Sequence, residues 1–107
     1  MAVKQYEIYW VKLDPTVGSE IQKKRPCLVI SPNEMNNSID TIIIAPLTTK
    51  SHSFPTRLKT NVDGKECWAV IDQLRALDKS RLCGKIGELD KKDIIALKKI
   101  ISEMLVK

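Results

Sequence analysis

Two charged side chains near the start of the sequence are spaced so that both could act on one phosphate. Gly18-Ser19-Glu20 is followed by Lys23-Lys24-Arg25-Pro26, which puts a carboxylate five residues before an arginine. The planar guanidinium of arginine forms paired, charge-assisted hydrogen bonds to phosphate oxygens. The segment predicts either a base and a cation presented to a phosphate or an ordinary solvated surface loop.

Three further polar clusters follow apolar runs. Thr48 comes directly after Pro46-Leu47, where a hydroxyl holds a phosphate or, more often, caps a turn. Asp72-Gln73 ends the run CWAVI; an aspartate in that place is either paired with an arginine or, together with Gln73, contacts the edges of RNA bases. Asp78 to Leu82 by itself predicts a polar turn.

The histidine and cysteine content argues against a metal site. His52 is the single histidine and lies in a polar stretch, which favours an exposed loop residue and disfavours both a histidine metal site and a two-histidine ribonuclease mechanism. Cys27, Cys67 and Cys83 show no Cys-x-x-Cys spacing. We expect them to be reduced thiols that pack as small hydrophobic groups. No metal and no cofactor are expected.

Length and composition predict one globular domain over residues 1–107. The chain is 43% apolar and 29% charged, as in soluble folded proteins. Its net charge of +5 favours a polyanionic partner, and nucleic acid before membrane. No apolar run approaches the length of a membrane span, and the first ten residues do not resemble a signal peptide. We therefore expect a cytoplasmic protein with no membrane association.

The hydrophobic pattern predicts several short strands followed by one helix. Residues 27–31 and 41–46 are continuous apolar runs typical of strands buried on both sides. Asp63-Gly64 lies between two strand-like runs and predicts a hairpin. Residues 90–106 change to helical spacing, with an apolar stripe that covers the sheet or, less often, binds a partner. The predicted strands are 6–13, 27–31, 41–46, 57–61, 67–74 and 84–87.

These elements predict a mainly β fold, a small curved sheet or barrel with a C-terminal helix. Such barrels have many unrelated functions. Four segments then narrow the choice: residues 9–31 (YWVKLDPTVGSEIQKKRPCLVIS), 44–48 (IAPLT), 72–82 (DQLRALDKSRL) and 84–87 (GKIG). Together they closely resemble the MazF/PemK family of toxin endoribonucleases, in order and over nearly the whole chain.

The resemblance implies an SH3-like barrel of the CcdB/PemK type that forms a homodimer. It implies the toxin of a type II toxin-antitoxin system, a metal-independent endoribonuclease that cuts single-stranded mRNA at a short motif and so inhibits translation. Attack by the RNA 2′-hydroxyl would leave a 2′,3′-cyclic phosphate and a 5′-hydroxyl. The cognate antitoxin would lay an extended acidic segment across the RNA site, and DNA would be contacted only indirectly, through that antitoxin.

The family motifs also imply roles for individual residues. Arg25 matches the arginine of the RP motif and would stabilise the transition state or transfer a proton. Its high pKa makes it a poor acid or base, which favours electrostatic stabilisation. Thr48 would orient the scissile phosphate, and Glu20 is a candidate base. Ser19 is a further candidate RNA contact. This chain has Ile21-Gln22 where Gln-Gly or Gln-Ala is common in the family, which puts the cleavage motif in question.

Asp72 and Gln73 match an acidic residue and a glutamine that the family uses for RNA contact, so we expect both to bind substrate. Two alternative functions compete with this interpretation. One is a CcdB-like toxin that binds DNA gyrase, which would leave Arg25, Thr48 and Glu20 without a purpose. The other is a non-catalytic RNA-binding module, in which the residue types are present but the geometry is wrong.

Overall fold

The computed structural model describes residues 2–13 and 23–106. Within them the chain forms seven strands, two α-helices and two short 3-10 turns. The strands are β1 (Glu7–Lys12), β2 (Lys24–Val29), β3 (Thr41–Thr48), β4 (Arg57–Val62), β5 (Lys65–Val70), β6 (Arg75–Asp78) and β7 (Leu82–Glu88). The helices are α1 (Asn33–Asn36) and α2 (Lys91–Leu105), and the 3-10 turns are η1 (Ile71–Gln73) and η2 (Lys79–Arg81).

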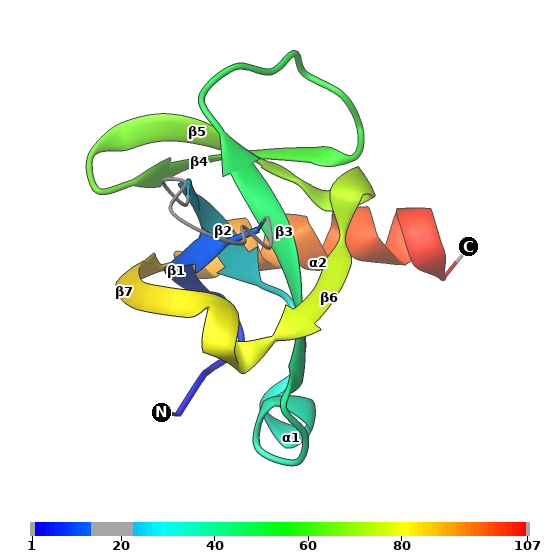
Figure 1. Cartoon of the computed structure of the whole chain (residues 1–107). Helices are drawn as coiled ribbons and strands as arrows, with labels where there is room; N and C mark the ends of the chain where they lie inside the picture. The colour runs from blue at the N-terminus through cyan, green and yellow to red at the C-terminus, as the bar shows by residue number, and fades with distance from the viewer. Residues whose placement is uncertain (1, 14–22, 107) are drawn as a thin grey trace.

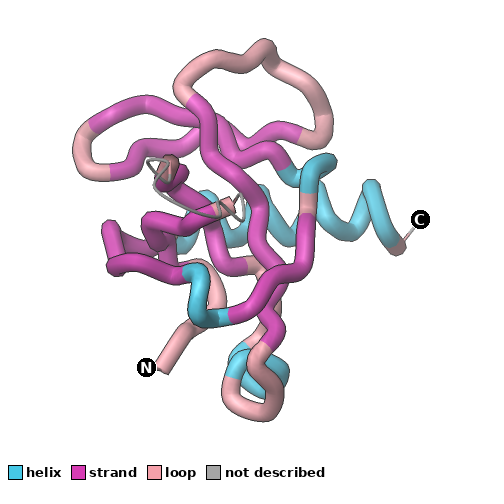
Figure 2. The backbone as a smooth tube through the Cα atoms, in the orientation of Figure 1, coloured by secondary structure: helices cyan, strands magenta, loops and turns pink. Residues whose placement is uncertain are grey.

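All strand pairs of the sheet are antiparallel, in the order β4-β5-β3-β2-β1-β7 (Figure 1). β3 is the central strand. β2 pairs with one of its edges, whereas the other edge pairs with β6 at residues 41–44 and with β5 at residues 47–48. Because one long strand serves three partners, the sheet curls into a half-barrel, with α2 on the far side in this view (Figure 2). The prediction of a curved, mainly β fold with a C-terminal helix is confirmed.

The sheet has a core on each face. Tyr9, Cys27 and Ile44 belong to one buried cluster, whereas Ile8, Leu28 and Ala45, their neighbours along the same strands, belong to the other. Successive side chains of a strand point to opposite faces. Both faces of β2 and β3 are therefore buried, which is why residues 27–31 and 41–46 are continuous apolar runs instead of alternating ones.

α2 covers the second of these cores. Leu97 is its fully buried residue and packs into the cluster that contains Leu28 and Ala45. Thr60 on β4 donates a hydrogen bond of 2.7 Å to the Asp93 carboxylate in the first turn of the helix. The apolar stripe of residues 90–106 therefore packs against the sheet, as expected. Asp90 is the N-cap residue, although its side chain makes no capping hydrogen bond.

Three local predictions need correction. Residues 67–74 were expected to form one strand, but β5 ends at Val70 and η1 follows. The strand predicted at 27–31 begins earlier, at Lys24, so Arg25 lies on β2, where Lys24 and Arg25 pair with Lys12 and Val11 of β1. β6 was not predicted; its single buried residue, Leu77, gives too short a pattern.

The predictions for the cysteines and for His52 are confirmed in part. Cys27 and Cys67 are buried free thiols, as expected, whereas Cys83 is exposed. Burial raises the pKa of Cys27 to about 12. His52 is an exposed loop residue, as expected. Among the described residues no helix is long and apolar enough to cross a membrane.

Candidate functional site

Arg25 and Thr48 line the same cavity. The β2–β3 ladder pairs Leu28 with Ala45 and ends at Cys27 and Pro46; continued by two residues, the same register sets Arg25 opposite Thr48. Beyond the ladder the surface is hollowed by a cavity of about 200 Å³, lined by Arg25, Pro26, Leu47, Thr48, Thr49 and Cys67. The exposed side chain of Arg25 and the partly exposed one of Thr48 therefore border a common space at one end of the sheet.

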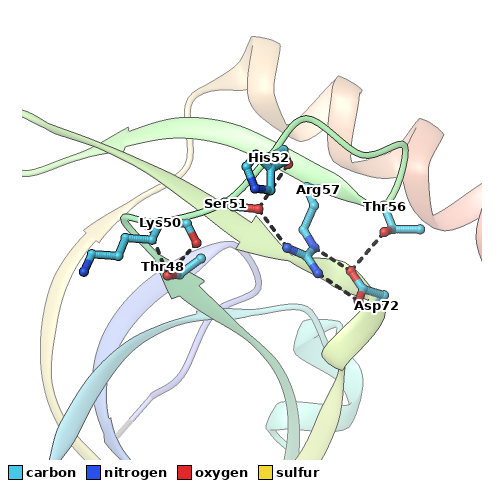
Figure 3. A network of polar contacts seen from close by, with 7 residues as sticks. All are labelled: Thr48, Lys50, Ser51, His52, Thr56, Arg57 and Asp72. Carbon is cyan, nitrogen blue, oxygen red and sulfur yellow. Dashed lines mark hydrogen bonds and ion pairs between the residues drawn. The ribbon is translucent and has the colours of Figure 1, made fainter.

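The hydroxyl of Thr48 also caps the turn that leaves β3 (Figure 3). It accepts a hydrogen bond of 3.2 Å from the backbone N–H of Lys50 and donates one of 3.3 Å to the Lys50 carbonyl. The turn-capping role considered from the sequence is confirmed. These bonds fix the side chain at the rim of the cavity.

A second cavity of about 300 Å³ adjoins the first, since Pro26, Leu47, Thr49 and Cys67 line both. Its remaining walls come from β1, β7 and the β4–β5 hairpin, and include the half-exposed indole of Trp10. Most of these walls are apolar, with Asp63 and Lys65 as the charged exceptions. The two cavities together offer a polar end, at Arg25 and Thr48, next to an apolar hollow large enough for a planar ring.

Asp72 lies in an ion pair with Arg57 (Figure 3). Arg57 Nε and Nη2 donate to the two carboxylate oxygens at 2.8 and 3.3 Å, and Thr56 donates a third hydrogen bond at 2.9 Å. The hydrogen bond from Arg57 lowers the pKa of Asp72, and the bond from Thr56 adds to it. Asp72 is thus paired with an arginine, the first of the two alternatives considered for it.

Arg57 is the residue at this site that the sequence analysis missed. Its Nη1 donates to Ser51 Oγ at 2.7 Å, and its guanidinium lies 5.2 Å from the centroid of the Phe54 ring. It therefore joins η1 to the segment 49–56 that follows Thr48. The signal that could have found it is the β4–β5 register, which sets Arg57 opposite Val70, two residues before Asp72.

The remaining candidates are distributed as follows. Gln73 is exposed on η1, which lies between β5 and β6. Asp72 and Gln73 therefore lie along the edge of β3 opposite to β2, across that strand from Arg25. Ser19 and Glu20 lie outside the described residues. In the parts of the chain that the structure describes, no three His, Cys, Asp or Glu side chains are grouped closely enough to hold a metal ion.

The protein is a small curved β-sheet with a helix on one face and with Arg25 and Thr48 at one end of the sheet. Known proteins share this architecture. Residues 4–105 match the model of the PemK-like, MazF-like toxins of type II toxin-antitoxin systems. Endoribonuclease EndoA of Bacillus subtilis is 33% identical over 96 residues, which cover 84% of this chain and 83% of that protein. The chain belongs to the PemK-like, MazF-like toxin family.

Solved structures agree on the fold. MazF of Deinococcus radiodurans superimposes with a TM-score of 0.80 at 21% identity, over 100% of this chain and 99% of that one. A mycobacterial endoribonuclease, solved in complex with its cognate antitoxin, gives a TM-score of 0.84 at 19% identity, over 98% of this chain and 96% of that one. The half-barrel with its C-terminal helix is therefore the fold of these toxins.

Proposed function

We propose that this protein is the toxin of a type II toxin-antitoxin system and an endoribonuclease that cleaves single-stranded mRNA at a short motif, inhibiting translation. The single observation that carries the proposal is the shared cavity of Arg25 and Thr48 in a chain of this toxin family. The relatives in that family include proteins named endoribonucleases, and the net charge of +5 suits a polyanionic substrate.

The reaction is a transfer within the RNA itself. The 2′-oxygen loses its proton to a base and bonds to the neighbouring phosphorus, and the bond from phosphorus to the 5′-oxygen breaks. That oxygen takes up a proton, so the products are a 2′,3′-cyclic phosphate and a 5′-hydroxyl. The protein must supply a proton acceptor, a proton donor and positive charge near the phosphorus.

The positive charge and the proton acceptor are each assigned to a side chain. Arg25 stabilises the charge that grows on the phosphate oxygens, because its guanidinium stays charged throughout. Thr48, fixed by its turn, orients the phosphate. Glu20 is assigned the role of base, with Ser19 as a substrate contact beside it. Gln73, exposed on η1, and Asp72, held by Arg57, contact the RNA bases.

The proposed partners are single-stranded RNA and a cognate antitoxin. The antitoxin would bind through an extended acidic segment, which the positive net charge favours, and contact with DNA would be indirect, through that antitoxin. A mycobacterial endoribonuclease of the same fold has been solved with its antitoxin. The toxin is proposed to act in the cytoplasm, where its mRNA substrate is found, and to form a homodimer.

Cleavage of a long natural RNA in excess EDTA tests the function. Mapped 5′ ends should share a short motif, and the upstream fragments should carry cyclic phosphate. Arg25→Ala should lower the cleavage rate at least 100-fold, the scale of losing one electrostatic stabiliser, while its thermal melting stays close to that of the wild type. Lys98→Ala removes an exposed cation on α2 and should cleave normally. Intact RNA with the wild-type protein would overturn the proposal.

A further inference from the structure

Trp68 lies directly beside Thr48 in the sheet. The two residues are opposite one another in the β3–β5 ladder, and Trp68 is in turn opposite Lys59 in the β4–β5 ladder. Residues directly opposite in antiparallel strands project from the same face, with Cβ atoms about 5 Å apart. Thr48, Trp68 and Lys59 therefore form one row of neighbouring side chains across three strands.

This row lies on the face away from the core that α2 covers. Leu47, Cys67 and Leu58 precede the three residues of the row along their strands, and all three are buried in that core. Trp68 is partly exposed, whereas 54% of the Lys59 side chain is exposed. Trp68 belongs to neither of the two buried clusters, so packing in a core does not account for a tryptophan at this position.

The row is completed by charge at both ends. Arg25 follows Thr48 on the β2 side, at the register position set out above. At the other end the Lys59 ammonium lies 5.8 Å from the centroid of the Trp68 ring. Lys59 also forms an ion pair of 3.3 Å with Glu66, but a pair this exposed is weak and is readily exchanged for a phosphate.

We propose that Trp68 and Lys59 form a second RNA subsite, which binds the nucleotide next to the scissile phosphate. The unpaired base stacks on the indole of Trp68, and Lys59 contacts the phosphate of that nucleotide. A cation, a hydroxyl, an aromatic ring and a second cation in one row are the groups that single-stranded nucleic acid requires. The inference rests on the proposed function, because it places the scissile phosphate at Arg25 and Thr48.

A binding cycle between protein and RNA tests the subsite. The probe is a labelled oligonucleotide containing the mapped motif, with one 2′-deoxynucleotide at the cut so that it is not cleaved. Trp68→Leu should weaken its binding about 10-fold, the effect of one stacked base, and Trp68→Phe should restore most of the loss. An abasic nucleotide beside the cut should weaken binding to the wild type by a similar factor but should not weaken Trp68→Leu further.

The lysine is tested with a matched control. Lys59→Met should weaken binding and reduce its dependence on salt, whereas Lys98→Met, on α2, should leave both unchanged. The subsite would be overturned if Trp68→Leu bound as tightly as the wild type, or if the losses from Trp68→Leu and from the abasic nucleotide were additive. Cleavage by the wild type would leave the proposed function intact in either case. Loss of self-association in sedimentation of Trp68→Leu would also overturn the subsite, since the face would then be a contact between copies. If the wild type does not cleave RNA, the proposed function fails and the subsite with it.

Discussion

At the scale of single residues, the carboxylate of Asp72 has a structural role that limits its role in recognition. Arg57 binds both of its oxygens and also holds Ser51, so the pair connects η1 to the segment after Thr48. The oxygens of Asp72 that would contact a base are already shared with Arg57 and Thr56. For Gln73, its exposed neighbour, the proposed role is RNA site selection only.

Asp72→Ala and Gln73→Ala should therefore differ. Gln73→Ala should change which RNA sites are cut, with an unchanged melting temperature. Asp72→Ala should change the sites and also lower the free energy of unfolding by about 1 kcal/mol, because Arg57 loses its partner at a partly exposed position. Mapping of cut sites together with denaturant unfolding separates the two effects. An unaltered cut pattern in both variants would contradict base contact at η1.

Glu7 is a buried carboxylate that links the β1–β7 pair. Its side chain is 7% exposed and is bonded to Lys85 Nζ at 2.8 Å, to the Tyr9 hydroxyl at 2.9 Å and to the Lys4 N–H at 2.7 Å. Burial alone would raise the pKa of Glu7, but these partners outweigh it, so the pKa lies below 4.5. Burial, helped by the bond to Glu7, raises the pKa of Tyr9 to about 12.

The lowered pKa of Glu7 predicts sensitivity to acid. Its contribution to stability is fully present above the ordinary glutamate pKa of 4.5 and is lost as the pH falls through the lower folded-state value. Glu7→Gln should cost about 1 to 3 kcal/mol at neutral pH, and its deficit relative to the wild type should shrink towards pH 3. Thermal melts of both proteins between pH 7 and pH 3 measure this. A deficit that does not change with pH would mean that the charge of Glu7 is unimportant.

At the scale of elements, the β4–β5 hairpin is the part most fully predictable from sequence. Asp63 and Gly64 adopt φ values of 52° and 79°, which a two-residue turn requires and which Gly and Asp tolerate. The turn pairs Val62 with Lys65, and the same register already sets Lys59 opposite Trp68. Counting outward from Asp63-Gly64 would therefore have revealed the Lys59–Trp68 pair from the sequence.

Other parts of the site were not predictable because their partners are remote in sequence. Arg25 and Thr48 were identified from their motifs, but their common cavity depends on where the β2–β3 ladder ends. Arg57 lies opposite Val70 at the far end of the β4–β5 ladder, and its pairing with Asp72 depends on β5 ending there and η1 following. β6 has one buried residue, Leu77, and its strand conformation comes from pairing with β3. Local patterns do not contain these tertiary contacts.

Docking of α2 should depend on one side chain. Leu97 is fully buried against the sheet, whereas Ile95, two residues earlier, is 71% exposed. Leu97→Ala should lower the free energy of unfolding by about 2 to 5 kcal/mol, through lost burial and the cavity left behind. Ile95→Ala, a matched control on the same helix, should change it by less than about 0.5 kcal/mol. Denaturant unfolding of both variants checks this, and similar losses in the two would contradict the packing described.

At the scale of the whole molecule, the two buried cores limit the surface on which RNA can bind to the ends and outer strands of the sheet. β2 and β3 are buried on both faces where the sheet curls, so an RNA strand cannot lie across their middle. Arg25, Thr48, Trp68 and Lys59 come from the parts of β2 to β5 beyond that double burial. The proposed RNA path therefore runs past these four side chains, along the ends and outer strands of the sheet.

Binding along this path should be governed by salt. A single strand that loses counterions at about three phosphates gives a logarithmic slope near −2, so affinity for the uncleavable oligonucleotide should fall about 20-fold between 50 and 200 mM salt. Arg25→Ala and Lys59→Met should each make the slope shallower by the amount that one phosphate contact contributes, about 0.7. The two cations lie at opposite ends of the row, so the double variant should lose about twice that amount. Fluorescence anisotropy at four salt concentrations measures the slopes. If the double variant keeps the wild-type slope, the strand follows another path over the protein.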